Sequence, residues 1–301
     1  VMQWGQWGAN FSTSEMISFI QKAVEHQLTC FDHADIYGGH TIEEAFGNAF
    51  SKSGISRNQV QLITKAGIKY PTERFPYSIK HYDYGYEYLI QVVDRALKNL
   101  QTDYIDVFCE TGYFTVAETE QIMEAGIHFG LKPKIHVNQF NSIGGIQAGI
   151  KHKALSVDHL EIMKPEDIEA LKNTETMPVA LPSCSYFLSI PYTPAREIIA
   201  AELPLALATD YNPGSTPSGN MNFVVATACI KMKMTPEEAI NAATINGAYA
   251  MDLSESHGSI TKGKKANLII TKPLHSYYEI PYCFATNLID SVWLNGEIIN
   301  R

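Results

Sequence analysis

The stretch that decides the fold is YIDVFC, residues 104–109. Its apolar residues do not alternate strictly with polar ones, which is typical of a parallel strand buried on both faces. Similar short runs recur along the chain, at Val1–Gln3, Leu28–His33, Val60–Lys65, Lys134–Gln139, Ala154–Asp158, Pro178–Ser183 and Pro204–Thr209. Together with residues 104–109 they predict eight parallel strands.

Helical signals separate these runs. Ser12 and Glu15 have the spacing of a capping box, and Thr235, Pro236 and Glu238 combine an N-cap with a proline in the first turn. Repeated strand–helix units predict a closed barrel or an open doubly wound sheet. Because no GxGxxG follows the first run, the sequence favours an α/β fold of the (β/α)8 TIM-barrel type.

Composition excludes several classes of partner. The chain has 301 residues and a formal net charge of -9, with no basic cluster, which argues against nucleic acid and anionic membranes as main partners. No apolar run reaches the length of about 18 residues that a membrane span needs. The five cysteines lack CxxC spacing, so we expect reduced thiols and a cytoplasmic protein.

Three polar residues mark the ends of early strands. Asp32 and Tyr37 follow the second run, and Lys65 ends the third. In a barrel, these positions face the active-site mouth, where Lys65 would lower the pKa of a tyrosine acid while Asp32 holds the lysine. The alternative, equally compatible with the spacing, is a buried Asp–Lys pair beside a packing tyrosine.

The segments FDHADIYGGHTIEEAFGNAF, LITKAGI and DYIDVF resemble the aldo-keto reductases over about a third of the chain. The resemblance implies that Asp32, Tyr37 and Lys65 are catalytic, with Tyr37 as proton donor to a carbonyl. Thr111 stands where that family has a substrate-orienting histidine. Arg196 is the only basic residue between residues 185 and 220, where the family binds its nicotinamide cofactor, so we expect no NADPH-dependent turnover.

Histidine and aspartate mark the later strands. His136 and His159 lie at the ends of the fifth and sixth runs, and Asp210 follows the eighth. Imidazole and carboxylate groups at one end of a sheet are typical ligands of zinc or iron with a bound water. The loop that carries Asn212, Gly214 and Ser215 could hydrogen-bond a carboxylate through side chains and backbone N–H groups.

From residue 106 the chain resembles the imidazolonepropionases of the amidohydrolase superfamily. The matching segments are DVFCETGYF, KIHVNQFNSIGGI, LSVDHLE, ATDYNPGSTPSGN and MTPEEAINAATINGAYAM. The resemblance assigns His136 and Asp210 to the metal and His159 to the catalytic pocket. It assigns Gln139 to the imidazolone ring and Asn212, Gly214 and Ser215 to the propionate or product. The family's His-x-His metal pair is absent from this sequence, which predicts an incomplete metal site.

Two unrelated halves therefore share one predicted barrel. We expect a reductase-like half-barrel at 1–105, an imidazolonepropionase-like half-barrel at 106–252 and a tail of β-sandwich strands at 253–301, with an Asn295-Gly296 hairpin turn. We expect the tail to pack on the barrel or to pair between two chains. A join at equivalent strands favours an engineered, catalytically inactive chimera. The alternatives are a metal-dependent hydrolase acting on a cyclic amide and an NADPH-dependent reductase.

Overall fold

The computed structural model describes residues 1–72, 75, 76, 79–83, 85–101, 104–212, 214–284 and 286–299, with the backbone alone at Tyr86. The chain divides into two compact units, Val1–Lys134 and Ile135–Arg301.

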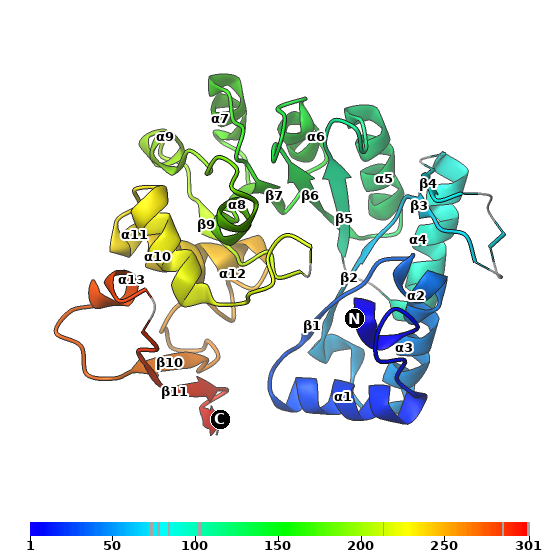
Figure 1. Cartoon of the computed structure of the whole chain (residues 1–301), viewed down its shortest axis with the longest axis horizontal. Helices are drawn as coiled ribbons and strands as arrows, with labels where there is room; N and C mark the ends of the chain where they lie inside the picture. Colours follow the sequence, from blue (N-terminus) through cyan, green and yellow to red (C-terminus); the bar gives the residue numbers. More distant parts are fainter. Residues whose placement is uncertain are drawn as a thin grey trace. The chain divides into compact units, whose positions relative to one another are not determined.

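Unit 1 is built on three parallel strands in the order β1-β2-β5 (Figure 1). The strands are β1 (Cys30–Asp32), β2 (Gln61–Lys65) and β5 (Tyr104–Cys109). The register pairs Asp32 with Ile63 and Lys65 with Asp106. The helices are α1 (Thr13–Glu25), α2 (Tyr37–His40), α3 (Ile42–Lys52), α4 (Tyr86–Leu100) and α5 (Val116–His128). A short η2 turn (Arg57–Gln59) precedes β2, and β3 (Ile68–Lys69) pairs with β4 (His81–Tyr82) in a separate antiparallel ladder.

The start of α1 confirms the predicted capping box. The N–H of Glu15 donates to Ser12 Oγ at 3.3 Å, and the N–H of Ser12 donates to Glu15 Oε2 at 2.8 Å, so two helix-end donors are satisfied. Met16 and Ile20 then point into a buried cluster that also contains Phe46, which is fully buried. This cluster is the core that unit 1 provides for itself.

The strand predicted at Val1–Gln3 is wrong. Met2–Trp4 forms the 3-10 helix η1, closed by a hydrogen bond from the Trp4 N–H to the Val1 carbonyl at 3.0 Å. The physical reason is the indole of Trp4, which packs against Phe11 and Phe46 at ring-centroid distances of 6.0 and 5.9 Å and so anchors a turn instead of an extended segment.

Unit 2 is built on parallel strands in the order β6-β7-β8-β9. β6 (Lys132–Val137) begins in the last residues of unit 1, and β7 (Ser156–His159), β8 (Met177–Ala180) and β9 (Ala206–Leu207) follow. The helices are α6 (Gly145–Lys151), α7 (Pro165–Leu171), α8 (Pro182–Leu188), α9 (Ala195–Ala200), α10 (Met221–Lys231), α11 (Pro236–Asn241), the π-helical segment η3 (Ala242–Asn246), α12 (Gly247–Ala250) and α13 (Glu279–Tyr282). The predicted α/β class with parallel strands is confirmed, and seven of the expected strands are present. A closed eight-stranded barrel is not confirmed.

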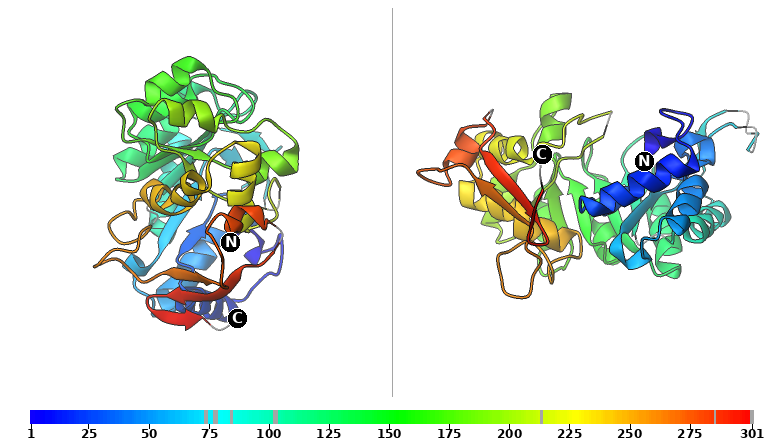
Figure 2. Two further views of the ribbon diagram at one scale, coloured as in Figure 1. Left: turned by 90° about the vertical axis from the view of Figure 1, so that its left-hand side faces the viewer. Right: turned by 90° about the horizontal axis from the view of Figure 1, so that it is seen from below.

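The tail forms a small antiparallel sheet in the order β10-β11-β12, which Figure 2 shows in orange and red apart from the parallel strands of unit 2. The strands are β10 (Leu268–Thr271), β11 (Ile289–Leu294) and β12 (Glu297–Ile299). The predicted hairpin turn is confirmed, with positive φ at Asn295 (49°) and Gly296 (86°) as a two-residue turn of this type requires. Residues 258–263, within the tail where β-strands were expected, form no strand.

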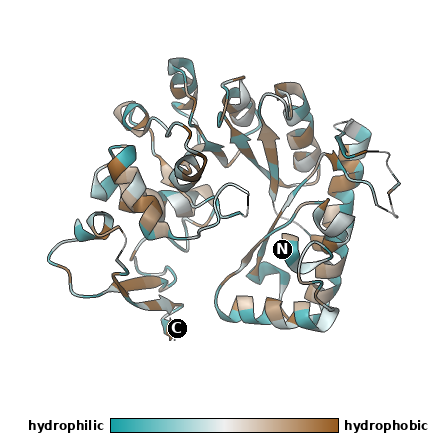
Figure 3. Ribbon diagram, viewed as in Figure 1, coloured by the Kyte–Doolittle hydropathy of each residue, from teal (hydrophilic) through white to brown (hydrophobic). Residues whose placement is uncertain are grey.

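The tail sheet lacks a core of its own. Its strands are hydrophobic in Figure 3, yet none of their described residues is buried, and the side chains of Ile269 and Ile298 are 60% and 52% exposed. A small sheet of this kind is only marginally stable alone. Across the described part of the chain, no helix combines the length and the hydropathy that a bilayer crossing demands.

Candidate functional site

The predicted site residues fall into two clusters, one in each unit. In unit 1, Lys65 Nζ forms an ion pair with Asp32 Oδ1 and also donates to the carbonyl of His33 at 3.0 Å. The hydroxyl of Tyr37 donates to Asp32 Oδ2 at 3.3 Å, and Lys65 Nζ lies 5.7 Å from the centre of the Tyr37 ring. The structure therefore brings Asp32, Tyr37 and Lys65 together, as the sequence predicted. Asp32 and Lys65 reach the same end of the sheet because β1 and β2 are parallel.

The pKa of Tyr37 in this cluster shifts in the direction opposite to the prediction. Burial raises the pKa of Tyr37, and the carboxylate of Asp32 adds to the rise, so these effects outweigh the lowering by Lys65. Burial lowers the pKa of Lys65, but the charge and hydrogen bond of Asp32 overcome it and raise the pKa above its ordinary value. Lys65 lowers the pKa of Tyr37, as predicted, but burial is the larger effect, so the expected net lowering is wrong. Thr111, the replacement for the family's histidine, is exposed.

A second acidic group in unit 1 was missed from the sequence. Asp35 is 4% exposed and Glu43 is 5% exposed. Burial, reinforced by the neighbouring Glu43, raises the pKa of Asp35 well above its usual range, although Arg95 NH2 lies 3.6 Å from Asp35 Oδ2. Burial also raises the pKa of Glu43, which accepts a hydrogen bond from the Thr64 hydroxyl. The sequence signal is the second aspartate of FDHAD, whose partners come from α3 and α4.

In unit 2, His136 and His159 lie beside each other. β6 and β7 pair in parallel with Val137 opposite His159, which places the two imidazoles at neighbouring strand ends with ring centroids 4.0 Å apart. Burial lowers the pKa of His136 well below its usual value, and His159 adds to the lowering. His159 and Leu160 both have positive φ, 88° and 68°, which is costly for residues with a Cβ and typical of functional sites.

Three side chains that the sequence did not single out hold His159. Glu161 Oε1 lies 3.3 Å from His159 Nδ1, and the same oxygen accepts a hydrogen bond from Ser185 Oγ at 2.9 Å. Thr193 Oγ1 donates to the carbonyl of His159 at 2.7 Å. Burial alone would lower the pKa of His159, but the hydrogen bond and charge of Glu161 raise it above the ordinary value. Glu161 was present in the quoted LSVDHLE segment, whereas Ser185 gave no signal in the sequence.

Asp210 belongs to a hydrogen-bonded loop. Ser215 Oγ donates to Asp210 Oδ2 at 3.0 Å, and Asn212 Nδ2 donates to the Asp210 carbonyl at 2.8 Å. Asn212 Oδ1 accepts from the N–H groups of Gly214 and Ser215, both at 2.8 Å. The predicted loop residues are therefore together, but the side-chain oxygen of Asn212 is engaged by the loop's own backbone.

Cys184 connects this loop to Gln139. Gln139 Nε2 donates to Cys184 Sγ at 3.3 Å. Burial, the negative charge of Asp210 and a hydrogen bond to that carboxylate raise the pKa of the thiol to about 12. Cys184 is therefore a neutral donor to Asp210, a role that its sequence position did not suggest.

The resemblance assigned His136 and Asp210 to a catalytic metal centre. Such a zinc site has three protein ligands and one open position. His136 and Asp210 supply two, and among the residues that the structure describes no group of three or more histidine, cysteine, aspartate or glutamate side chains is arranged to hold a metal ion.

Known protein families match two overlapping segments. Residues 1–132 match the aldo/keto reductase family, and residues 106–299 match the amidohydrolase family. The chain belongs to the amidohydrolase family. Both predicted resemblances are confirmed, and the matches overlap from β5 into the segment after α5.

Curated relatives agree with this membership. The imidazolonepropionase of Flavobacterium johnsoniae is 76% identical over 251 residues, covering 80% of this chain and 61% of that protein. The imidazolonepropionase of Staphylococcus saprophyticus is 32% identical over 291 residues, covering 94% of this chain and 68% of that protein. The chain thus spans about three fifths of the length of the Flavobacterium protein.

Solved structures show the same fold. A guanine deaminase from C. acetobutylicum with bound guanine has a TM-score of 0.67 at 13% identity, covering 96% of this chain and 77% of that chain. An adenosine deaminase from Xanthomonas campestris with bound zinc has a TM-score of 0.62 at 16% identity, covering 94% of this chain and 70% of that chain.

Proposed function

We propose that this chain is a composite protein in which the catalytic residues of both parent families are only partly present. On this proposal it is an engineered scaffold, cytoplasmic when expressed, with a reductase-like part at 1–105, an imidazolonepropionase-like part at 106–252 and a residual tail at 253–301. As an isolated polypeptide it hydrolyses no cyclic amide and reduces no carbonyl.

The observation that carries the proposal is the hydrogen bonding of the Asp210 carboxylate. The resemblance assigns this carboxylate to the metal, yet Ser215 and Cys184 both donate hydrogen bonds to it. A carboxylate satisfied by neutral donors has less to gain from a cation than an unpaired one. The paired imidazoles of His136 and His159 are likewise stabilised within the protein, through Glu161 and the raised pKa of His159. These contacts support a self-contained polar network in place of a metal centre.

Metal analysis combined with activity tests this proposal. The purified chain is dialysed against zinc or iron, its metal content is measured, and hydrolysis of imidazolone propionate is assayed beside a full-length imidazolonepropionase. We expect less than one tightly held metal ion per chain and no turnover. A thermal melt should be cooperative and unmoved by the metal or by NADPH, because a ligand stabilises only a fold that binds it. Stoichiometric metal together with hydrolysis would refute the proposal.

The alternative is a metal-dependent hydrolase that acts on a cyclic amide. It is favoured by the 76% identity to a curated imidazolonepropionase and by the clustering of Gln139 and Asp210 around Cys184. This alternative requires additional ligands for the metal. Addition of a His-x-His peptide segment from a relative should then restore metal binding, whereas the composite scaffold should not respond.

A further inference from the structure

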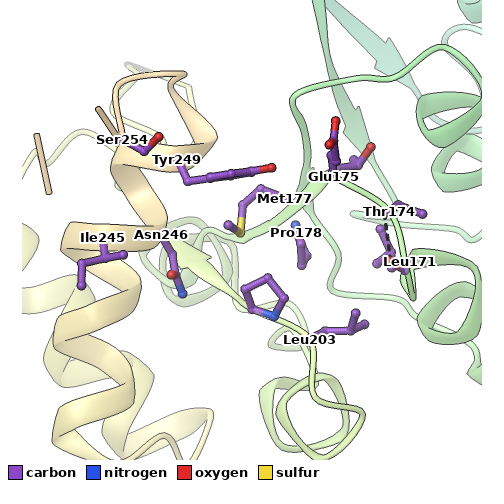
Figure 4. A pocket seen from close by; sticks show the side chains of 12 residues that line it. Leu171, Thr174, Glu175, Met177, Pro178, Leu203, Ile245, Asn246, Tyr249 and Ser254 are labelled. Atoms are coloured by element: carbon purple, nitrogen blue, oxygen red, sulfur yellow. Dashed lines mark hydrogen bonds between the residues drawn. The ribbon is translucent and has the colours of Figure 1, made fainter. Parts of the chain in front are cut away.

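A pocket lies in unit 2, away from the histidine cluster. Its volume is about 270 Å³. It is lined by Leu171, Thr174, Glu175, Thr176, Met177, Pro178, Leu203, Pro204, Ile245, Asn246, Tyr249 and Ser254 (Figure 4). The space is comparable to the lower end of the range for small-molecule sites.

The direction of the strands separates this pocket from the candidate site. Met177 and Pro178 are the first residues of β8, and Leu203 and Pro204 precede β9. His159 is the last residue of β7. Because β7, β8 and β9 are parallel, the pocket is at the N-terminal ends of the strands and the histidine cluster is at the C-terminal ends.

One wall of the pocket comes from an irregular helix. The π-helical segment Ala242–Asn246 interrupts the path from α11 to α12, and such segments recur at functional sites. Asn246 Nδ2 donates to the carbonyl of Leu205 at 2.8 Å, which ties this turn to the start of β9. Tyr249 follows on α12 and is directed toward the segment that carries Glu175 and Met177 (Figure 4).

The lining is apolar inside and amphipathic at the opening. Leu171 and Met177 are 2% and 3% exposed and form the interior. Ile245 and Tyr249 lie at the opening and are 48% and 41% exposed. A bound apolar group would cover these two side chains and remove their apolar surface from water.

The negative charge of Glu175 at the opening favours a cationic ligand. Glu175 is exposed, and among the described residues its carboxylate has no ion-pair partner. A tyrosine ring and a carboxylate that line one pocket are suited to an aromatic cation, whose ring packs on the tyrosine and whose charge pairs with the carboxylate. We propose that this pocket binds a small aromatic primary amine, with its ring against Tyr249 and its ammonium group at Glu175. Since the pocket is separate from the histidine cluster, the proposal does not depend on the proposed function.

Titration with 2-phenylethylamine tests the proposal. Binding to the intact chain is followed by calorimetry and by the amide chemical shifts of residues 171–177. Ethylbenzene serves as the uncharged analogue and phenylacetate as the anionic one. We expect saturable binding of the amine and weaker binding of both analogues, with phenylacetate the weakest.

Variants locate the site. Glu175→Gln should weaken amine binding about threefold to fivefold, the effect of a partly exposed ion pair. Glu202→Gln, an exposed glutamate that does not line the pocket, is the matched control and should leave binding unchanged. Tyr249→Ala should weaken binding about tenfold, and Tyr249→Phe, which keeps the ring, should restore most of it. The proposal is overturned by lack of saturable amine binding, by equal binding of phenylacetate, or by equal effects of the two glutamate variants.

Discussion

The buried contacts of Glu161 offer the sharpest test of the structure. Glu161 is 4% exposed and accepts a hydrogen bond from Ser185 while it pairs with Nδ1 of His159, residues that are 1% and 3% exposed. Glu161→Ala leaves two buried donors unpaired, each costing about 1–2 kcal/mol, and adds a cavity. We therefore expect the free energy of unfolding of unit 2 to fall by about 3 kcal/mol. Glu161→Gln keeps the volume and one acceptor, and should lose about 1 kcal/mol.

Urea unfolding, followed by circular dichroism and by hydrogen exchange of the Ser156–His159 peptide, measures the loss. The control is Glu169→Ala, because the side chain of Glu169 is 71% exposed and its pair with Lys172 should contribute less than about 1 kcal/mol. The reasoning is refuted if the Glu161 and Glu169 variants lose the same stability.

The same contact predicts a dependence on pH. The pKa of His159 is raised in the folded state, because Glu161 outweighs the effect of burial. Protonation of His159 therefore stabilises the fold fully below the unfolded-state pKa, and this contribution is lost as pH rises through the folded-state pKa. The penalty of Glu161→Ala should accordingly be larger at pH 6 than at pH 9. An equal penalty at both pH values would contradict the assigned pairing.

Three further outcomes follow from other parts of the chain. Phe46→Ala in the fully buried core of unit 1 should cost about 3–5 kcal/mol, measured by urea unfolding with tryptophan fluorescence. Gly126→Ala should destabilise by about 1–3 kcal/mol in thermal melts, since a Cβ there would lie 2.6 Å from a buried side-chain carbon. Gly247→Ala is the control, with 3.6 Å of clearance, and should be neutral or stabilising. The pKa of Glu237 is about 2 because tyrosine hydroxyls donate to it, so Tyr277→Phe should raise it in a carbon-13 NMR titration.

Helices and strands whose formation depends on neighbouring residues could be predicted from the sequence. The strand at Tyr104–Cys109 has the bounds expected from its apolar run, and the helix starts at Ser12 and Thr235 have the predicted capping boxes. These features depend on residues within a few positions of each other. The segment Val1–Gln3 failed because three residues carry little periodicity, and the indole of Trp4 decides their conformation through distant aromatic contacts.

In the candidate site, contacts set by parallel strands could be predicted, whereas contacts between residues far apart in the sequence could not. His136 and His159 were predicted to meet because parallel strands bring their ends together. Ser185 comes from a helix 24 residues beyond Glu161, and no pattern in the sequence joins the two. The pKa of Tyr37 was predicted in the wrong direction, since the net effect depends on burial and on how closely Asp32 holds the neighbouring ammonium group.

The buried clusters and the predicted metal site draw their residues from different parts of the sequence. One buried cluster draws its residues from unit 1 alone, and two others draw theirs from residues 163–250 of unit 2. By the resemblance, the metal centre of the imidazolonepropionases needs a His-x-His pair in addition to His136 and Asp210, and this sequence lacks that pair. On the proposal that the chain is a composite, residues that match two families can form ordered clusters while the ligands of one metal centre are not all present.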